Sequence, residues 1–252
     1  MSNKTIPIPK SYLEKIIKPV SRITESCILK TNKDVFYTVC SSIDNSVILY
    51  AKTILPIEID EAIKLNIISI PKFLTGLKCL GSDGEFTIKT STNNIVCQNV
   101  NGDNEKTHFT YHLVDDSVIK ECTIQPSKFS MLDFNTVFVI TSEKAKQVLS
   151  ASSFATDASK VYFFIDDEEN ICAKIDDETL QNIDNITIPL TKTYEGEPIT
   201  ESFPISLEIF KNLAAIKNDV TVKINNKFKL IIFQVTDEDA VELKYIVSAL
   251  IK

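Results

Sequence analysis

The two histidines are the residues of this 252-residue chain that first suggest metal or acid–base chemistry. His108 and His112 fall within residues 107–113, where alternation of apolar and polar residues predicts a β-strand. Four residues of strand separate them by about 13 Å, which is too far for two ligands of one metal ion. We therefore predict no metal site here and place both histidines on the solvent side of the strand, opposite Phe109 and Tyr111.

The acidic run at residues 166–169 (Asp-Asp-Glu-Glu) is a second candidate for cation binding. It lacks the ligand spacing and the central glycine of a calcium loop, and it lies between two predicted strands. We interpret it as the solvated tip of a hairpin.

The six cysteines are widely spaced and form no C-x-x-C pair. Free, buried thiols are therefore predicted, rather than a disulfide framework or a zinc site, and this usage fits a reducing cytoplasm, or the host cytoplasm if the protein is viral. The sequence selects no Cys/His nucleophile pair. The cysteines are Cys27, Cys40, Cys79, Cys97, Cys122 and Cys172.

Motifs for catalysis or cofactor binding are missing from the sequence. There are five glycines in total, and no G-x-x-x-x-G-K-[ST], G-x-G-x-x-G, H-E-x-x-H or G-x-S-x-G occurs. We predict no enzymatic activity, no catalytic residue, no cofactor and no bound metal. No apolar run has the length of a signal peptide or a membrane span, so we expect a soluble protein without a membrane partner.

The elements that would position functional residues are mostly strands. Alternating stretches rich in β-branched and aromatic residues recur along the chain, and turn-forming pairs such as Asp44-Asn45 and Asn225-Asn226 separate them. Strands joined so tightly must be antiparallel. Helical spacing predicts four helices, at residues 9–23, 71–80, 142–154 and 205–216, with Pro9 and Pro71 in first turns and Pro19 ending or kinking the first helix.

The order helix, strands, helix, strands occurs twice. Phe73, Leu74, Leu77 and Leu80 have the same spacing as Ile209, Phe210, Leu213 and Ile216, and Tyr111 corresponds to Tyr245. We interpret the chain as two copies of one α+β unit, with domains at residues 1–117 and 135–252 and a linker at residues 118–134.

Positive charge is concentrated in the predicted helices. The four helices, with the last extended to Lys217, contain ten basic and three acidic residues, whereas the rest of the chain contains 17 basic and 31 acidic residues. An assembly that gathered these helices on one surface would present sequence-independent phosphate contacts despite the net charge of −7. The candidate DNA-binding residues are Lys10, Lys15, Lys18, Arg22, Lys72, Lys78, Lys144, Lys146 and Lys211.

This pattern resembles the DNA sliding clamp family, in particular the phage T4-type and proliferating cell nuclear antigen-type processivity factors. The likeness extends over nearly the whole chain as topology. Its clearest stretch is residues 203–252, in which a helix, a hairpin and the closing strand V-E-L-K-Y-I-V precede a short tail. The resemblance implies an α+β clamp fold and a homotrimeric ring around double-stranded DNA, and it implies no catalytic chemistry. It further implies a clamp loader and a tethered DNA polymerase as partners, and the Asn-, Ile- and Lys-rich composition suits a bacteriophage.

The family's partners dock short peptides beside the interdomain linker and the C-terminal tail. The matching positions are Met131, Leu132 and Phe134 in the linker, and Ala249, Leu250 and Ile251 in the tail. Plain core packing is the alternative for each of these residues. Three further readings of the whole chain stay open: a non-ring processivity factor of the same fold, a β-rich structural protein such as a virion component, and an enzyme whose site no recognisable motif marks.

Overall fold

A computed structural model describes residues 5–59, 62–80, 85–89, 94–98, 107–124, 126–214, 218–236 and 241–250. The chain forms two compact units. The first comprises Met1–Ile124 and Glu238–Leu243, and the second comprises Gln125–Asp237 and Lys244–Lys252. Within the described residues, no helix is long and apolar enough to cross a membrane.

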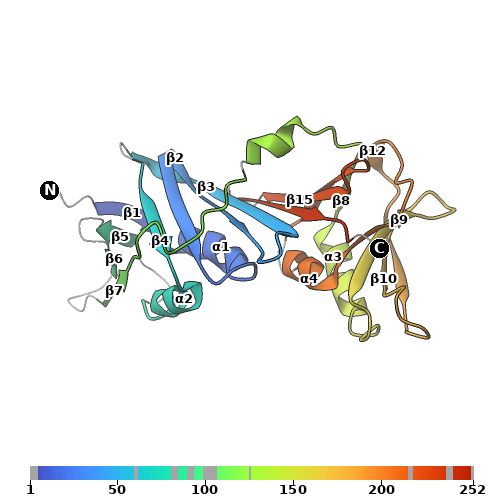
Figure 1. Cartoon of the computed structure of the whole chain (residues 1–252), viewed down its shortest axis with the longest axis horizontal. Coiled ribbons are helices and arrows are strands. Elements are labelled where there is room, and N and C mark those ends of the chain that lie inside the picture. Colours follow the sequence, from blue (N-terminus) through green and yellow to red (C-terminus); the bar gives the residue numbers. More distant parts are fainter. Residues whose placement is uncertain are drawn as a thin grey trace. The chain divides into compact units, whose positions relative to one another are not determined.

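The first unit combines two helices with antiparallel strands (Figure 1). Strand β2 pairs with β3 on one side and β4 on the other, β1 pairs with β5, and β6 pairs with β7. The elements are β1 (Thr5–Pro9), α1 (Lys10–Val20), β2 (Cys27–Ser41), β3 (Val47–Ile59), β4 (Lys64–Ile67), α2 (Ile70–Lys78), β5 (Glu85–Lys89), β6 (Asn94–Gln98) and β7 (His108–His112).

The second unit is built in the same way (Figure 1). Some of its strands pair in the order β12-β8-β14-β15-β16. The others form a four-stranded sheet of order β11-β10-β9-β13. The elements are the 3-10 helix η1 (Pro126–Met131), β8 (Thr136–Ile140), α3 (Ser142–Ala151), β9 (Lys160–Ile165), β10 (Ile171–Asp176), β11 (Ile186–Thr191), β12 (Tyr194–Gly196), β13 (Phe203–Ser206), α4 (Leu207–Ala214), β14 (Val220–Asn225), β15 (Leu230–Thr236) and β16 (Glu242–Ser248), whose first two residues belong to the first unit.

Each helix buries the apolar stripe that its sequence periodicity predicts. Leu13, Ile16, Ile17 and Val20 of α1 are buried, and Phe73 and Leu77 of α2 are 1% and 0% exposed. Burying a side chain of this size contributes about 1.5–3 kcal/mol. Lys18 of α1 and Lys72 and Lys78 of α2 are left exposed to solvent as a result.

Aromatic rings fix the helices to the strands in both units. In the first unit, Phe73 of α2 contacts the rings of Phe109 and Tyr111 on β7, at centroid distances of 5.9 and 5.2 Å. Gly76 allows this close approach, since a Cβ there would lie 2.9 Å from the Phe109 ring. The Tyr111 hydroxyl accepts a hydrogen bond from Ser69 N–H (2.9 Å), next to the start of α2.

In the second unit, one buried ring joins three elements. Phe163 of β9 contacts Phe138 of β8, Phe210 of α4 and Phe233 of β15, at centroid distances of 6.0–6.3 Å. Because β8 and β15 belong to one sheet and β9 to the other, this cluster ties the two sheets and a helix into one core.

Two predicted helix starts are wrong. Pro9, expected in the first turn of a helix, is the last residue of β1 and pairs with Glu85, and α1 begins at Lys10. Ile205, expected to begin the fourth helix, lies in β13 opposite Val161 of β9. In both places pairing with a strand that is distant in sequence overrides local helical spacing.

Several local predictions are confirmed. α1 ends at Val20, one residue after Pro19, and Pro71 occupies the first turn of α2. Asn45 has a positive φ of 56° in the turn after β2. The Asp166 carboxylate accepts hydrogen bonds from the backbone of Glu168 and Asn170, as in a solvated hairpin tip. His108 and His112 are exposed, while Tyr111 is buried.

Candidate nucleic-acid and partner interfaces

The basic residues of α1 are not all equally accessible. Lys18 is exposed, whereas Lys10 and Lys15 are half-buried. Glu14 lies between two of these lysines, with Oε1 3.7 Å from Lys10 Nζ and Oε2 2.6 Å from Lys18 Nζ. The Glu14 carboxylate therefore offsets part of the positive charge of α1.

Arg22 is exposed but does not lie on α1. The helix ends at Val20, and the Arg22 N–H donates to the Pro19 carbonyl (3.2 Å) in the turn that follows. Its guanidinium therefore belongs to the loop between α1 and β2.

On α2, Lys72 and Lys78 are both exposed. Ser69 caps this helix by accepting from the Lys72 N–H (3.4 Å), which places Lys72 in the first turn and Lys78 in the last. Within the described part of the chain neither lysine has an ion-pair partner. These side chains are available for phosphate contacts.

In the second unit the basic residues are fewer. Lys146 of α3 and Lys211 of α4 are exposed, while Lys144 is half-buried and donates from Nζ to Gln147 Oε1 (3.2 Å). Glu143 and Glu208 lie in the first turns of the same helices. The four helices together carry eight basic and three acidic residues with the bounds observed here, so their positive excess persists.

Within each unit the two helices are neighbours. α1 packs against α2 in the first unit, and α3 packs against α4 in the second. Each unit therefore combines lysines from two neighbouring helices, and the strands of the unit pack against the other side of its core (Figure 1). A pair of helices with exposed lysines suits sequence-independent contact with a phosphate backbone.

Two of the three predicted partner-binding residues of the linker line a cavity of about 380 Å³ in the second unit. Leu132 and Phe134 lie in its wall together with Phe129 of η1. The neighbouring strands complete its lining with Val137, Lys223, Ile232, Gln234 and Lys244. Met131 is 84% exposed at the end of η1.

The predicted tail residues are placed separately. The Ala249 N–H donates to the Lys229 carbonyl (2.8 Å), and the Leu250 N–H donates to the Pro204 carbonyl (2.9 Å). Among the described residues that line the linker cavity, neither Ala249 nor Leu250 occurs. Ile251 lies outside the described residues.

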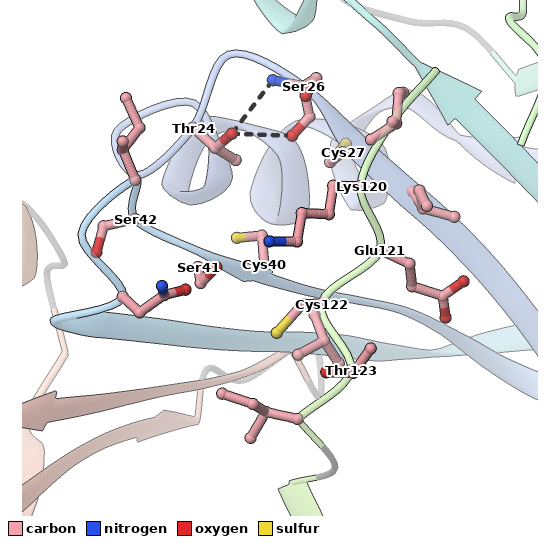
Figure 2. A pocket seen from close by; sticks show the side chains of 16 residues that line it. Thr24, Ser26, Cys27, Cys40, Ser41, Ser42, Lys120, Glu121, Cys122 and Thr123 are labelled. Carbon is pink, nitrogen blue, oxygen red and sulfur yellow. Dashed lines mark hydrogen bonds between the residues drawn. The ribbon is translucent and has the colours of Figure 1, made fainter. Parts of the chain in front are cut away.

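A larger cavity, of about 480 Å³, lies in the first unit and was not predicted from the sequence. It is lined by residues of the loop before β2, the start and end of β2, the turn after it and the linker, namely Thr24, residues 26–28, residues 39–43, Asn45 and residues 119–124. Figure 2 shows the side chains of Lys120, Cys40 and Cys122 directed into it. No sequence motif marks this cavity, because three separate segments build it.

Two of the thiols that line this cavity, Cys27 and Cys40, are not activated nucleophiles. Burial raises the pKa of Cys27 to about 12 and raises the pKa of Cys40 further still. Since the thiolate is the reactive form, both residues are inert near neutral pH. Within the described ranges, no group of three His, Cys, Asp or Glu side chains is arranged to hold a metal ion.

Comparison with known proteins gives a match at the level of structure. No family model and no curated protein sequence matches this chain. Proliferating cell nuclear antigen (PCNA) from A. fulgidus, solved with the C-terminal region of FEN-1 bound, aligns with a TM-score of 0.77 at 12% identity over 98% of each chain. PCNA from Entamoeba histolytica aligns at 0.73 with 12% identity over 97% of each chain.

PCNA from Thermococcus kodakaraensis gives the same result, with a TM-score of 0.74 at 13% identity over 96% of this chain and 97% of that one. The alignments include both units and extend over nearly the full length of each protein, so the predicted α+β clamp fold is confirmed. This chain has the fold of the PCNA-type DNA sliding clamps.

Proposed function

We propose that this chain is a DNA sliding clamp, which closes with further copies of itself, as a homotrimer, into a ring around duplex DNA. The observation that carries the proposal is the full-length clamp fold with a net positive charge on all four helices combined. The rest of the chain is strongly acidic, which favours DNA contact at the helices and disfavours it elsewhere.

The mechanism is topological rather than catalytic. Lysines such as Lys72, Lys78 and Lys146 contact phosphates without reading bases, so affinity is weak, salt-sensitive and independent of sequence. A closed ring holds the protein on DNA while these contacts exchange, so the ring slides without dissociating. The wider DNA-binding set remains Lys10, Lys15, Lys18, Arg22, Lys72, Lys78, Lys144, Lys146 and Lys211.

Partner proteins, among them a DNA polymerase and a clamp loader, dock along the linker in this proposal. Both cavities support this assignment, since residues 119–124 line the larger one and Leu132 and Phe134 line the smaller one. Ala249, Leu250 and Ile251 remain proposed partner contacts at the tail. The domain bounds of 1–117 and 135–252, with the linker between them, belong to the same proposal.

Solution molar mass measured by light scattering, over a range of protein concentrations, tests the assembly. A mass near 85 kDa, three times the 28.3 kDa chain, is the expected result. A monomer that persists at high concentration would overturn the self-closing ring and leave a non-ring processivity factor.

A further inference from the structure

One wall of the larger cavity is the first part of the linker, which continues a segment with little regular structure of its own. Residues 113–124 contain one turn, where the Val118 N–H donates to the Asp115 carbonyl (3.0 Å), and no strand or helix. Its backbone is joined to β4 where the Val114 N–H donates to the Asn66 carbonyl (3.4 Å). Side-chain contacts must therefore hold the rest of the segment in place.

A group of charged and amide side chains supplies those contacts. Lys64 Nζ lies 3.0 Å from Asp116 Oδ2 and 3.4 Å from Glu121 Oε2. Lys30 forms a second ion pair with Glu121. The Asn66 amide donates to the Val114 carbonyl (3.0 Å) and to Asp116 Oδ1 (2.7 Å). We call Lys30, Lys64, Asn66, Asp116 and Glu121 the linker clamp.

The electrostatics of the linker clamp agree with its geometry. The Asn66 amide and the Lys64 ammonium hold the pKa of Asp116 below its usual value, and Lys30 does the same for Glu121. The ion pairs are partly exposed, with Lys64 at 32% and Glu121 at 44% of side-chain surface, so each one is individually weak. Their arrangement on both sides of buried Ile119 makes them act together on one short segment.

We propose that Lys64 is a positioning residue for the partner site, because it bridges Asp116 and Glu121 and so holds residues 119–124 as the wall of the larger cavity. The assignment of that cavity to partners rests on the proposed function. The positioning itself is a local property of the first unit and requires neither DNA nor a partner.

The cysteines of the chain provide a direct readout of this wall. Cys27 and Cys40 line the cavity and are 2% and 6% exposed. Cys97 and Cys172 are equally buried but do not line it, so they gain reactivity only if the fold opens more widely. Cys79 is exposed and reports the intrinsic rate of alkylation.

The experiment measures alkylation of each thiol by iodoacetamide at about pH 8.5, where an exposed thiol is partly ionised, with sites resolved by mass spectrometry. The variant is Lys64→Ala, and Lys64→Arg is the conservative rescue because it keeps the charge. Lys52→Ala is the matched control: Lys52 pairs with Glu242 (2.7 Å) at 36% exposure in the same unit, and it does not line the larger cavity.

In Lys64→Ala we expect Cys27 and Cys40 to react about threefold to tenfold faster than in the parent, as for the loss of a small ion-pair network. Cys79, Cys97 and Cys172 should keep their rates, and Lys64→Arg and Lys52→Ala should resemble the parent. High salt should accelerate Cys40 labelling in the parent and have a smaller effect in Lys64→Ala, in which only the Lys30–Glu121 ion pair is left to be screened.

Equal Cys40 rates in Lys64→Ala and the parent would overturn the positioning role. A parallel rise at Cys97 and Cys172 would also overturn it, since that pattern means general destabilisation. Failure of the ring would appear instead in the molar mass, with the alkylation result unchanged, so the two proposals fail separately.

Discussion

Helices α1 and α2 of the first unit carry five lysines and one glutamate, whereas α3 and α4 of the second carry three lysines and two glutamates. The buried faces of these two helix pairs are far more alike. Phe73 and Leu77 on α2 correspond to Phe210 and Leu213 on α4, and all four are at most 2% exposed. The comparison shows that the duplicated core fixes the fold, while the surface charge differs between the copies. For the proposed clamp, this difference predicts that DNA contact is weighted toward the first unit.

The largest expected effect tests the equality of the two cores. Phe73→Ala and Phe210→Ala should each reduce the free energy of unfolding by about 3–5 kcal/mol, because each leaves a cavity among buried rings. Chemical denaturation measures both. A loss below about 1 kcal/mol for one variant only would show that the two cores are not equivalent.

The next effect tests the difference in surface charge. Replacing Lys18, Lys72 and Lys78 with alanine removes three positive charges, and so does replacing Lys144, Lys146 and Lys211. We expect about a tenfold loss of duplex affinity at low salt for the first set and about threefold for the second, from the number of accessible phosphate contacts. Fluorescence anisotropy with duplexes of two unrelated sequences provides the measurement.

Equal losses for the two sets would contradict the weighting toward the first unit. A loss that differs between the two duplex sequences would contradict the sequence-independent contact, since phosphates carry no base information.

A smaller effect concerns the acidic residue on the basic surface of the first unit. Glu14→Gln should raise duplex affinity about twofold to threefold at low salt, because Lys10 and Lys18 lose their competing carboxylate. The gain should disappear as salt is raised. Glu208→Gln on α4 is the matched change in the second unit. A larger gain for Glu208→Gln than for Glu14→Gln would contradict the weighting of DNA contact toward the first unit.

The smallest effect concerns acid stability in the second unit. Ser159, Thr179 and Lys160 all donate to the Asp177 carboxylate and hold its pKa well below the usual value. A group with a depressed folded pKa stabilises the fold above its unfolded pKa of about 3.9, and this contribution is lost as pH falls below that value. Asp177→Asn should therefore flatten the fall in stability between about pH 5 and pH 3.

Denaturation midpoints across this pH range provide the test for Asp177. Asp157→Asn is a suitable control, because Asp157 is an exposed carboxylate of the same unit. An unchanged pH dependence in Asp177→Asn would show that its hydrogen bonds do not persist in solution.

The sequence predicts the elements better than their long-range partners. Periodicity in α1 and α2 identifies both the buried stripe and the exposed lysines, since each helix has a single apolar side. It misassigns Pro9 and Ile205, because pairing with Glu85 and Val161 depends on strands that are distant in the chain. Local spacing contains no information about such pairings.

The candidate sites likewise include residues that local sequence pattern identifies and residues that only folding brings together. The lysines of the helices follow from local pattern, and the resemblance to clamps directs attention to Leu132 and Phe134, which do line a cavity. The larger cavity and the linker clamp could not be found from sequence. Lys64 and Asp116 are 52 residues apart in the chain, and folding brings them together at the edge of β4.

The most direct test of the central claim, encirclement of DNA, is trapping on linear duplex DNA with ends that can be blocked. The protein is first allowed to thread onto biotinylated DNA, streptavidin is added to block both ends, and the complex is washed at high salt. A closed ring should stay on the DNA until a restriction enzyme cuts it, although its phosphate contacts are screened. Release by salt at the same rate from blocked and open DNA would contradict the account.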